Sequence, residues 1–264
     1  IVNIGFNESS ERESNDRPFE LPEYQDSLVQ CITAANPNTV VLLNAGGNVD
    51  MSKWIDKVPS LLHLWYAGQE GGTAVAEILF GKVNPSGKLP ISFEKKWEDN
   101  PAYPYYYDRD GDKRVEYKEG LFMGYRHYDV SETKPQFAFG YGMSYTTFKY
   151  SDLRIDREKG RDLAVKVRFT VKNTGKHDGA ETAQVYIRPI NPKVERPYKE
   201  LKGFAKHFIR KNAVQEIEIP LDKDAFSYYK TELKDFDYDA GSYEVLVGSA
   251  SDDIRLRKVI QIEK

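Results

Sequence analysis

The chain has 264 residues, of which 40% are hydrophobic and 30% charged, with a formal net charge of −3 at pH 7. This length allows two domains of ordinary size, and the small net charge gives no electrostatic basis for binding nucleic acid. The sequence has no apolar run near the ~20 residues that span a bilayer and no N-terminal signal pattern, so we expect no membrane partner.

The first hundred residues alternate short apolar runs with helical periodicity, a pattern typical of a parallel sheet with helices. The predicted elements, in chain order, are a strand at 1–5, a helix between Pro22 and Asn36, strands at 39–43 and 61–66, and a helix through Ala74, Ile78 and Leu79. The first helix has Leu28, Ile32 and Ala35 on one face. The run 28–32 also suggests a buried helical position for Cys31, the only cysteine.

Two loops that follow predicted strands are candidate functional sites. Residues 44–47 (Asn-Ala-Gly-Gly) come at the carboxyl end of the second strand, where open α/β sheets bind ligands. Residues 7–17 follow the first strand and contain four carboxylates and two arginines. Because like charges disfavour ionisation, such crowding is expected to leave one carboxyl group protonated near neutral pH, as a general acid requires.

The pattern changes twice in the second half of the chain. Residues 84–150 are irregular and rich in Gly, Pro and Tyr, which is typical of functional or interdomain structure. The Tyr103–Tyr107 cluster could stack on a sugar or close a domain interface. After Ser151 apolar residues alternate with polar ones in runs at 163–171, 183–187, 217–221 and 243–247, which predicts a β-sandwich. We therefore place a domain boundary between residues 149 and 150.

A metal or cofactor is not expected. The histidines His63, His127, His177 and His207 share no ligand spacing, and one cysteine cannot build a thiolate site. The segment 140–144 (Gly-Tyr-Gly-Met-Ser) lacks the order of a nucleophile elbow and is interpreted as structural.

The segment Glu13-Ser14-Asn15-Asp16-Arg17 resembles the Glu-x-x-Asp-Arg loop of glycoside hydrolase family 3 β-glucosidases, and later motifs follow that family's order. They are Leu21-Pro22 with Gln25, 36–41, 65–72, 84–90, 124–126 with Tyr128, 139–142 with 144–146, 173–175, 178–179, Glu181, 199–204 and 247–249. The resemblance covers essentially the whole chain. It implies a partial α/β sandwich domain at 1–149, incomplete at its N-terminus, followed by a fibronectin type III-like β-sandwich at 150–264.

The resemblance also implies roles in the loop. Glu13 corresponds to the family's general acid/base, three residues before the Asp-Arg pair. Glu11 is the alternative, because the loop varies in length and this chain has Arg12 and Ser14 where small residues are common. Asp16 and Arg17 are expected to support the loop. The implied reaction is that of a retaining, exo-acting β-glucosidase on terminal β-D-glucosyl residues of oligosaccharides or glucosides.

One part of the family's machinery has no counterpart in this sequence. The family draws its nucleophilic aspartate from an N-terminal (β/α)8 barrel, and no eight-fold strand-helix repeat is present; Lys206-His207-Phe208 matches a barrel motif only by coincidence. Retaining hydrolysis needs both carboxyl groups, so we expect the chain alone to be inactive and a barrel domain to be its partner.

Three alternatives stay open at this level. The enzyme could be a β-xylosidase or another exo-β-glycosidase of the same family, or the chain could be a non-catalytic carbohydrate-binding or scaffold fragment. The resemblance is compatible with a homodimer. A role in degrading biomass would place the protein in the periplasm or outside the cell.

Overall fold

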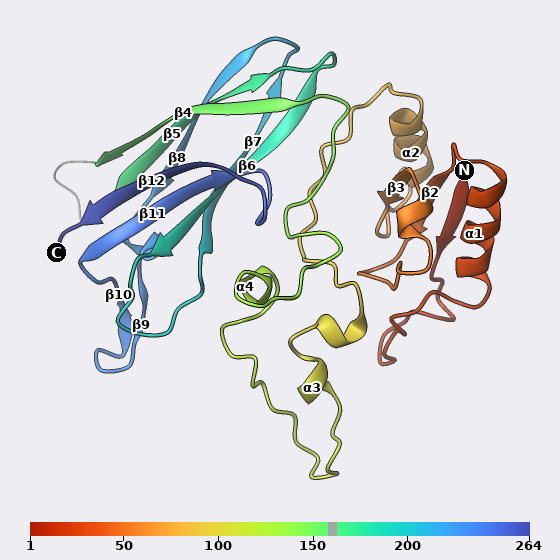
Figure 1. Ribbon diagram of the computed structural model, residues 1–264, viewed down its shortest axis with the longest axis horizontal. Helices are drawn as coiled ribbons and strands as arrows, with labels where there is room; N and C mark the ends of the chain where they lie inside the picture. The colour runs from red at the N-terminus through yellow and green to blue at the C-terminus, as the bar shows by residue number, and fades with distance from the viewer. Residues whose placement is uncertain (158–162) are drawn as a thin grey trace. The chain divides into compact units, whose positions relative to one another are not determined.

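The computed structural model describes residues 1–157 and 163–264 (Figure 1). Contacts within the chain divide it into two compact units. The α/β unit comprises residues 1–82, 93–118 and 133–137, and the sandwich unit comprises residues 83–92, 119–132 and 138–264. The predicted combination of an α/β part with an all-β part is confirmed, and each unit is described by itself below.

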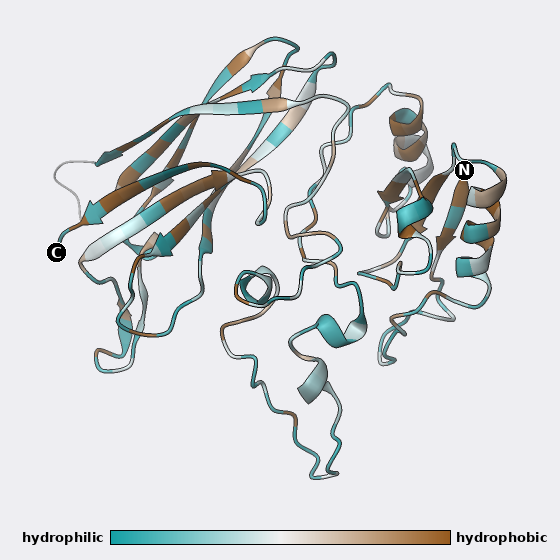
Figure 2. Ribbon diagram, in the orientation of Figure 1, coloured by the Kyte–Doolittle hydropathy of each residue, from teal (hydrophilic) through white to brown (hydrophobic). Residues whose placement is uncertain are grey.

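A parallel three-stranded sheet forms the centre of the α/β unit, in the order β1 (Val2–Gly5), β2 (Val40–Asn44), β3 (Ser60–His63). Val41 and Leu43 of the middle strand are fully buried, as expected for a strand covered on both faces. Figure 2 shows the same strands as hydrophobic segments. The remaining short elements are η1 (Ile55–Lys57), η2 (Trp97–Asp99) and α3 (Tyr103–Tyr106).

Helix α1 (Gln25–Ala35) has the predicted extent, but a different face is buried. Val29 and Thr33, one turn apart, are its buried residues, whereas Leu28 is 45% exposed. The prediction that Cys31 is buried is wrong, because it lies on the exposed side of the helix. The Gln25 side chain bonds the Gly5 backbone through both its amide atoms, at 2.7 and 2.9 Å, and so joins the start of α1 to the end of β1.

Helix α2 (Gly71–Leu79) is apolar along much of its length, with the sequence GGTAVAEIL, yet none of its residues is buried. Phe80, directly after it, is 90% exposed. A helix with so many apolar side chains is stable when other protein surface covers those side chains, because few of its residues are polar enough to face water.

The sandwich unit consists of two antiparallel sheets and a small ribbon. The larger sheet has the order β12 (Ile254–Ile262), β11 (Gly241–Gly248), β6 (Gly179–Pro189), β7 (Glu200–Ile209). The second sheet has the order β4 (Phe148–Arg157), β5 (Val165–Asn173), β8 (Val214–Leu221), and β9 (Tyr228–Lys230) pairs with β10 (Asp235–Asp237). A 3-10 turn, η3 (Lys223–Ala225), follows β8. Inward-facing residues such as Val167, Phe169 and Val245 form one core, which confirms the predicted β-sandwich.

Segments that precede residue 150 also pack in the sandwich unit. Asn84 donates to the Asp178 carbonyl oxygen at 2.8 Å, and the Tyr125 hydroxyl in α4 (Tyr125–Tyr128) accepts the Leu201 N–H at 2.8 Å. Lys199, only 3% exposed, forms an ion pair with Asp129. These bonds hold residues 83–92 and 119–132 against strands β6 and β7. The boundary at 149/150 stays a prediction.

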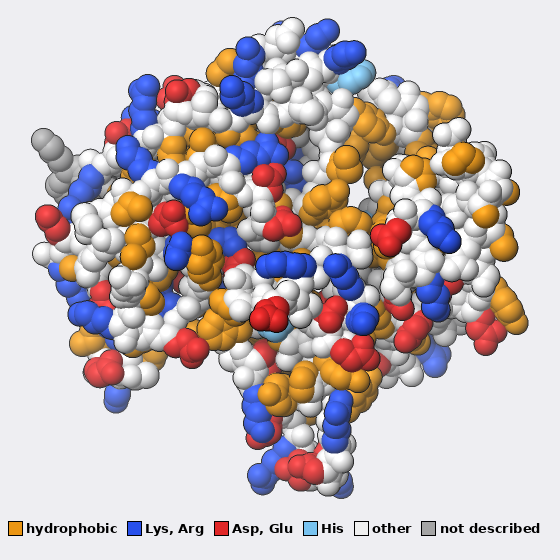
Figure 3. All heavy atoms as spheres, in the orientation of Figure 1, with side chains coloured by type: hydrophobic (Ala, Val, Ile, Leu, Met, Phe, Trp, Pro, Cys, Tyr) orange, Lys and Arg blue, Asp and Glu red, His pale blue; other side chains and the backbone are white. Residues whose placement is uncertain are grey.

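Charges of both signs are interspersed on the face shown in Figure 3, in keeping with the small net charge. Within residues 1–157 and 163–264, no helix is both long and apolar enough to span a bilayer.

Candidate active-site loop

The carboxyl ends of the three parallel strands carry the candidate residues. Loop 7–17 follows β1, the loop 44–47 follows β2, and Tyr66 lies just after β3. Gly5 ends β1 with φ 145°, and a Cβ there would lie 1.9 Å from the Asn44 carbonyl oxygen. Only glycine allows β1 to turn into the loop this close to β2.

Glu11 is the most strongly held carboxylate of the loop. It accepts a hydrogen bond from the Tyr66 hydroxyl and another from the Gly46 N–H at 3.4 Å, and it lies 3.5 Å from Nε of Arg17. A Cβ on Gly46 would approach a Glu11 oxygen to 2.4 Å, so a larger residue there would displace the Glu11 carboxylate from its present position. Glu11 therefore joins the loop to both neighbouring strand ends.

Two titratable groups, at the end of β3 and just after it, are perturbed by their surroundings. Loss of solvation and the hydrogen bond to Glu11 raise the pKa of Tyr66 to about 12. Burial lowers the pKa of His63, whose Nε2 lies 3.1 Å from the Gly47 carbonyl oxygen, and the positive charge of Arg17 lowers it further. The phenol therefore keeps its proton at neutral pH and donates a hydrogen bond to Glu11.

Glu13 has a different environment. It lies at the tip of a tight turn closed by a bridge between Arg12 and Asn15, and its side chain is exposed. Among the described residues, no hydrogen bond or ion pair involves its carboxylate; only its carbonyl oxygen accepts a bond, from Asn15 at 3.4 Å. Ser14, the next residue, has φ 65°, a conformation that favours glycine. The carboxylate of Glu13 is thus free to meet a group outside the unit.

Arg17 makes several contacts that hold the loop, and Asp16 interacts electrostatically with Tyr106. Arg17 donates to the carbonyl oxygens of Asn48 at 2.7 Å and Pro18 at 3.2 Å, and its guanidinium lies 4.6 Å from the Phe6 ring centroid. Interaction with the Asp16 carboxylate raises the pKa of the Tyr106 phenol.

An aromatic cluster lies beside this loop within the α/β unit. Trp97 packs edge-on against Tyr103 and Tyr106, with ring centroids 5.7 and 5.5 Å apart, and Phe19 lies 6.3 Å from it. Tyr107 continues the cluster and is 53% exposed. The tyrosines are conspicuous in the sequence, but the interaction of Tyr106 with Asp16 is not, since ninety residues separate them.

An acidic triplet was also missed. Asp108, Asp110 and Asp112 are exposed, with one carboxylate oxygen of each within 4.8 Å of the others. The Asp108 oxygens accept the N–H groups of Gly111 and Lys113 at 2.8 and 2.9 Å. These bonds stabilise the turn formed by residues 108–113. The expectation that the protein needs no metal stays a prediction.

A parallel sheet with an acidic loop at its carboxyl edge, combined with an antiparallel two-sheet sandwich, defines an α/β domain followed by a fibronectin-like module. Comparison with known families agrees. Residues 1–145 match the glycosyl hydrolase family 3 C-terminal domain, and residues 181–251 match the fibronectin type III-like domain. The chain belongs to glycosyl hydrolase family 3, and the predicted resemblance is confirmed.

The relatives are β-glucosidases. Thermostable beta-glucosidase B of Acetivibrio thermocellus is 42% identical over 264 residues, covering 99% of this chain and 35% of the relative. The crystal structure of the Kluyveromyces marxianus beta-glucosidase in complex with glucose superposes with a TM-score of 0.92 at 41% identity, covering 99% of this chain and 31% of that one. The crystal structure of the Bifidobacterium adolescentis GH3 beta-glucosidase also superposes with a TM-score of 0.92, at 37% identity, covering 98% of this chain and 38% of that one. The chain thus spans about a third of the length of these relatives.

Proposed function

We propose that this chain supplies the general acid/base of a retaining, exo-acting β-glucosidase, with Glu13 as that group. The substrates would be terminal β-D-glucosyl residues of oligosaccharides or glucosides. The nucleophilic aspartate would come from a (β/α)8 barrel domain outside this chain. The β-glucosidase relatives support the reaction type, and their greater length leaves room for such a domain.

The observation that carries the choice of Glu13 is the contrast between the two glutamates of the loop. An acid/base must reach the glycosidic oxygen and later a water molecule, so its carboxylate has to be available to substrate. Glu13 is exposed at a turn tip, whereas the carboxylate of Glu11 is occupied by Tyr66, Gly46 and Arg17. Glu11 is therefore a positioning residue that holds the base of the turn.

The uncovered helix α2 supports the proposal of a partner domain. Its apolar side chains lack burial within the described part of this chain, and Phe80 after it is exposed. Retaining hydrolysis requires two carboxyl groups about 5 Å apart, so the second one has to approach from that partner.

A chimera tests the proposal. We would join this chain to the part of the Acetivibrio thermocellus enzyme that it does not cover, and compare Glu13→Gln with the unmodified chimera. Loss of general acid catalysis should lower kcat/KM by about 10²- to 10⁴-fold on alkyl glucosides, which have poor leaving groups. On dinitrophenyl glucoside, whose leaving group needs no proton, the glycosylation step should change little.

Azide provides the second measurement, because this anion attacks a glycosyl-enzyme without a general base. With dinitrophenyl glucoside, azide should accelerate Glu13→Gln and yield β-glucosyl azide. The matched control is Glu11→Gln, for which we expect a reduced rate on all substrates and no azide product. If Glu11→Gln gave the azide product and Glu13→Gln did not, the assignment to Glu13 would be wrong.

A further inference from the structure

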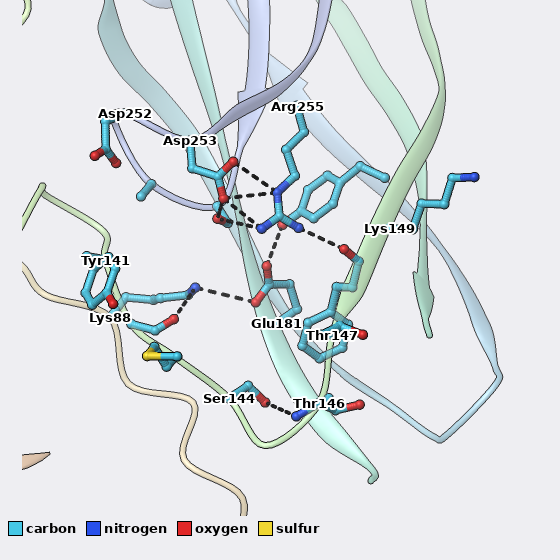
Figure 4. Close-up of a pocket in the computed structure, with 16 residues that line it drawn as sticks. Lys88, Tyr141, Ser144, Thr146, Thr147, Lys149, Glu181, Asp252, Asp253 and Arg255 are labelled. Atoms are coloured by element: carbon cyan, nitrogen blue, oxygen red, sulfur yellow. Dashed lines mark hydrogen bonds and ion pairs between the residues drawn. The ribbon is translucent and has the colours of Figure 1, made fainter. Parts of the chain in front are cut away.

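The sandwich unit contains a cavity of about 750 Å³ at the start of β4 (Figure 4). Its walls come from the chain entering β4, from the loop before β12, and from Lys88 and Glu181, all of which belong to this unit. The volume lies within the range of about 300–1,000 Å³ typical of small-molecule sites. The cavity does not include any residue of the loop 7–17.

Buried, paired charges form the floor of this cavity. Glu181 on β6 is 4% exposed; it accepts a hydrogen bond from the Tyr150 hydroxyl at 2.9 Å and lies 3.5 Å from Nζ of Lys88. Lys88 also donates to the Gly142 carbonyl oxygen at 3.1 Å. Buried charges are tolerated when they are paired in this way, so the floor is a fixed polar surface.

The charges that line the cavity cancel. The cations are Lys88, Lys149 and Arg255, and the carboxylates are Glu181, Asp252 and Asp253. An anionic ligand would meet the three carboxylates, and a cationic ligand the three cations. The lining therefore favours a neutral ligand that both donates and accepts hydrogen bonds.

The rim supplies unused polar groups and apolar surface. The side chains of Lys149 and Asp252 are exposed and form no ion pair or hydrogen bond within the described part of the chain. Tyr141 and Met143 are 38% and 74% exposed. Sugars present hydroxyl groups at their edges and C–H groups on their faces, which matches donors and acceptors placed beside a ring and a thioether.

We propose that this cavity of the β-sandwich is a binding site for a neutral saccharide. The ligand is either a free mono- or disaccharide or the end of a polysaccharide chain, since both present the same hydroxyl and C–H groups. The site does not rest on the role of Glu13, and the 264-residue chain alone should bind.

The test is a titration of the ¹⁵N-labelled chain followed by NMR. Glucose and cellobiose serve as neutral probes, and glucose 6-phosphate and glucosamine as charged ones. We expect saturable shifts at residues 141–150 and 249–255, with the neutral sugars bound about tenfold more tightly than the charged analogues. If a soluble β-glucan bound more tightly per chain end than cellobiose does, the ligand would be the end of a polysaccharide chain. If the two affinities were equal, the ligand would be the free sugar.

Two variants test the groups themselves. Asp252→Asn and Lys149→Ala should each raise the Kd for cellobiose by about tenfold, the effect of one charged hydrogen bond. Lys172→Ala is the matched control, because Lys172 pairs with Lys149 across β4 and β5 and does not line the cavity. Thermal unfolding would verify that each variant is folded.

The proposal is overturned if folded protein shows no saturable binding of either neutral sugar, or if glucose 6-phosphate binds more tightly than glucose. It is equally overturned if Lys172→Ala weakens binding as much as Lys149→Ala does. None of these results would bear on Glu13, whose test requires catalysis.

Discussion

Glu11 and Glu13 are two residues apart and meet different surroundings. The first is held by a phenol, a backbone N–H and a guanidinium, and the second projects from a turn that places Ser14 in the left-handed region. Residues held in an unfavourable backbone conformation occur often at active sites, because the surrounding structure keeps them there for function. The contrast between held and free carboxylates supports the division into positioning residue and acid/base.

The hydroxyl of Tyr66 gives a pH-dependent prediction. Its pKa is raised from the ordinary 10.0 to about 12, so the bond it donates to Glu11 stabilises the fold fully below pH 10 and is lost as pH rises through about 12. The difference between the tyrosinate absorbance titrations of the chain and of Tyr66→Phe should therefore be centred near pH 12. A difference centred near pH 10 would contradict the hydrogen bond to Glu11.

At this scale the sequence singled out a candidate loop but not the contacts that this loop makes. The run of carboxylates and the resemblance singled out residues 7–17. Tyr66 lies 55 positions from Glu11, and Tyr106 lies 90 positions from Asp16, so no local pattern could pair them. The error at Cys31 has a different origin, because the apolar residues of α1 are distributed around the helix and the buried face is set by its contact with the sheet.

At the scale of elements, Lys88 and Glu181 join the segment 83–92 to the start of β6. Their side chains are 15% and 5% exposed, so removal of one partner leaves a buried charge with less compensation. We expect Lys88→Met to lower the free energy of unfolding by about 3–5 kcal/mol. Urea unfolding of the chain, followed by near-UV circular dichroism, would measure it.

The control for this prediction is Lys82→Met. Lys82 also pairs with a glutamate, Glu77, but its side chain is 73% exposed, and such pairs contribute about 0–1 kcal/mol. A second check is the double change Lys88→Met with Glu181→Met, which removes both charges and should recover much of the loss. Equal effects of Lys88→Met and Lys82→Met would show that the buried pair adds nothing.

Strands were predicted where their side chains alternate without interruption. This holds for β6, β8 and β11, each of which contains one of the predicted runs, and for β5, which overlaps the run at 163–171 but begins two residues later. Strand β4 was not predicted, because an irregularity between Ser151 and Arg154, with Asp152 at φ 58°, shifts the alternation. Strand β7 has a similar shift in its pairing with β6, and its exposed Phe204 and Phe208 obscure the pattern.

For the whole molecule, the proposed division of catalytic groups predicts that the 264-residue chain alone does not hydrolyse aryl β-glucosides above the rate in buffer. One carboxyl group cannot carry out a double displacement. The measurement is release of nitrophenol by the purified chain, with the chimera as the positive control. Turnover by the chain alone at a rate comparable to the chimera would refute the need for a partner domain.

The division of the chain into units has a practical consequence. The polypeptide passes from the α/β unit to the sandwich unit at residues 82/83, returns at 92/93, and changes unit again at 118/119, 132/133 and 137/138. No single backbone cleavage can separate the two units intact, because each of the two fragments would contain segments of both units. The two modules are therefore expected to be inherited, expressed and degraded together, as interleaved parts of one polypeptide.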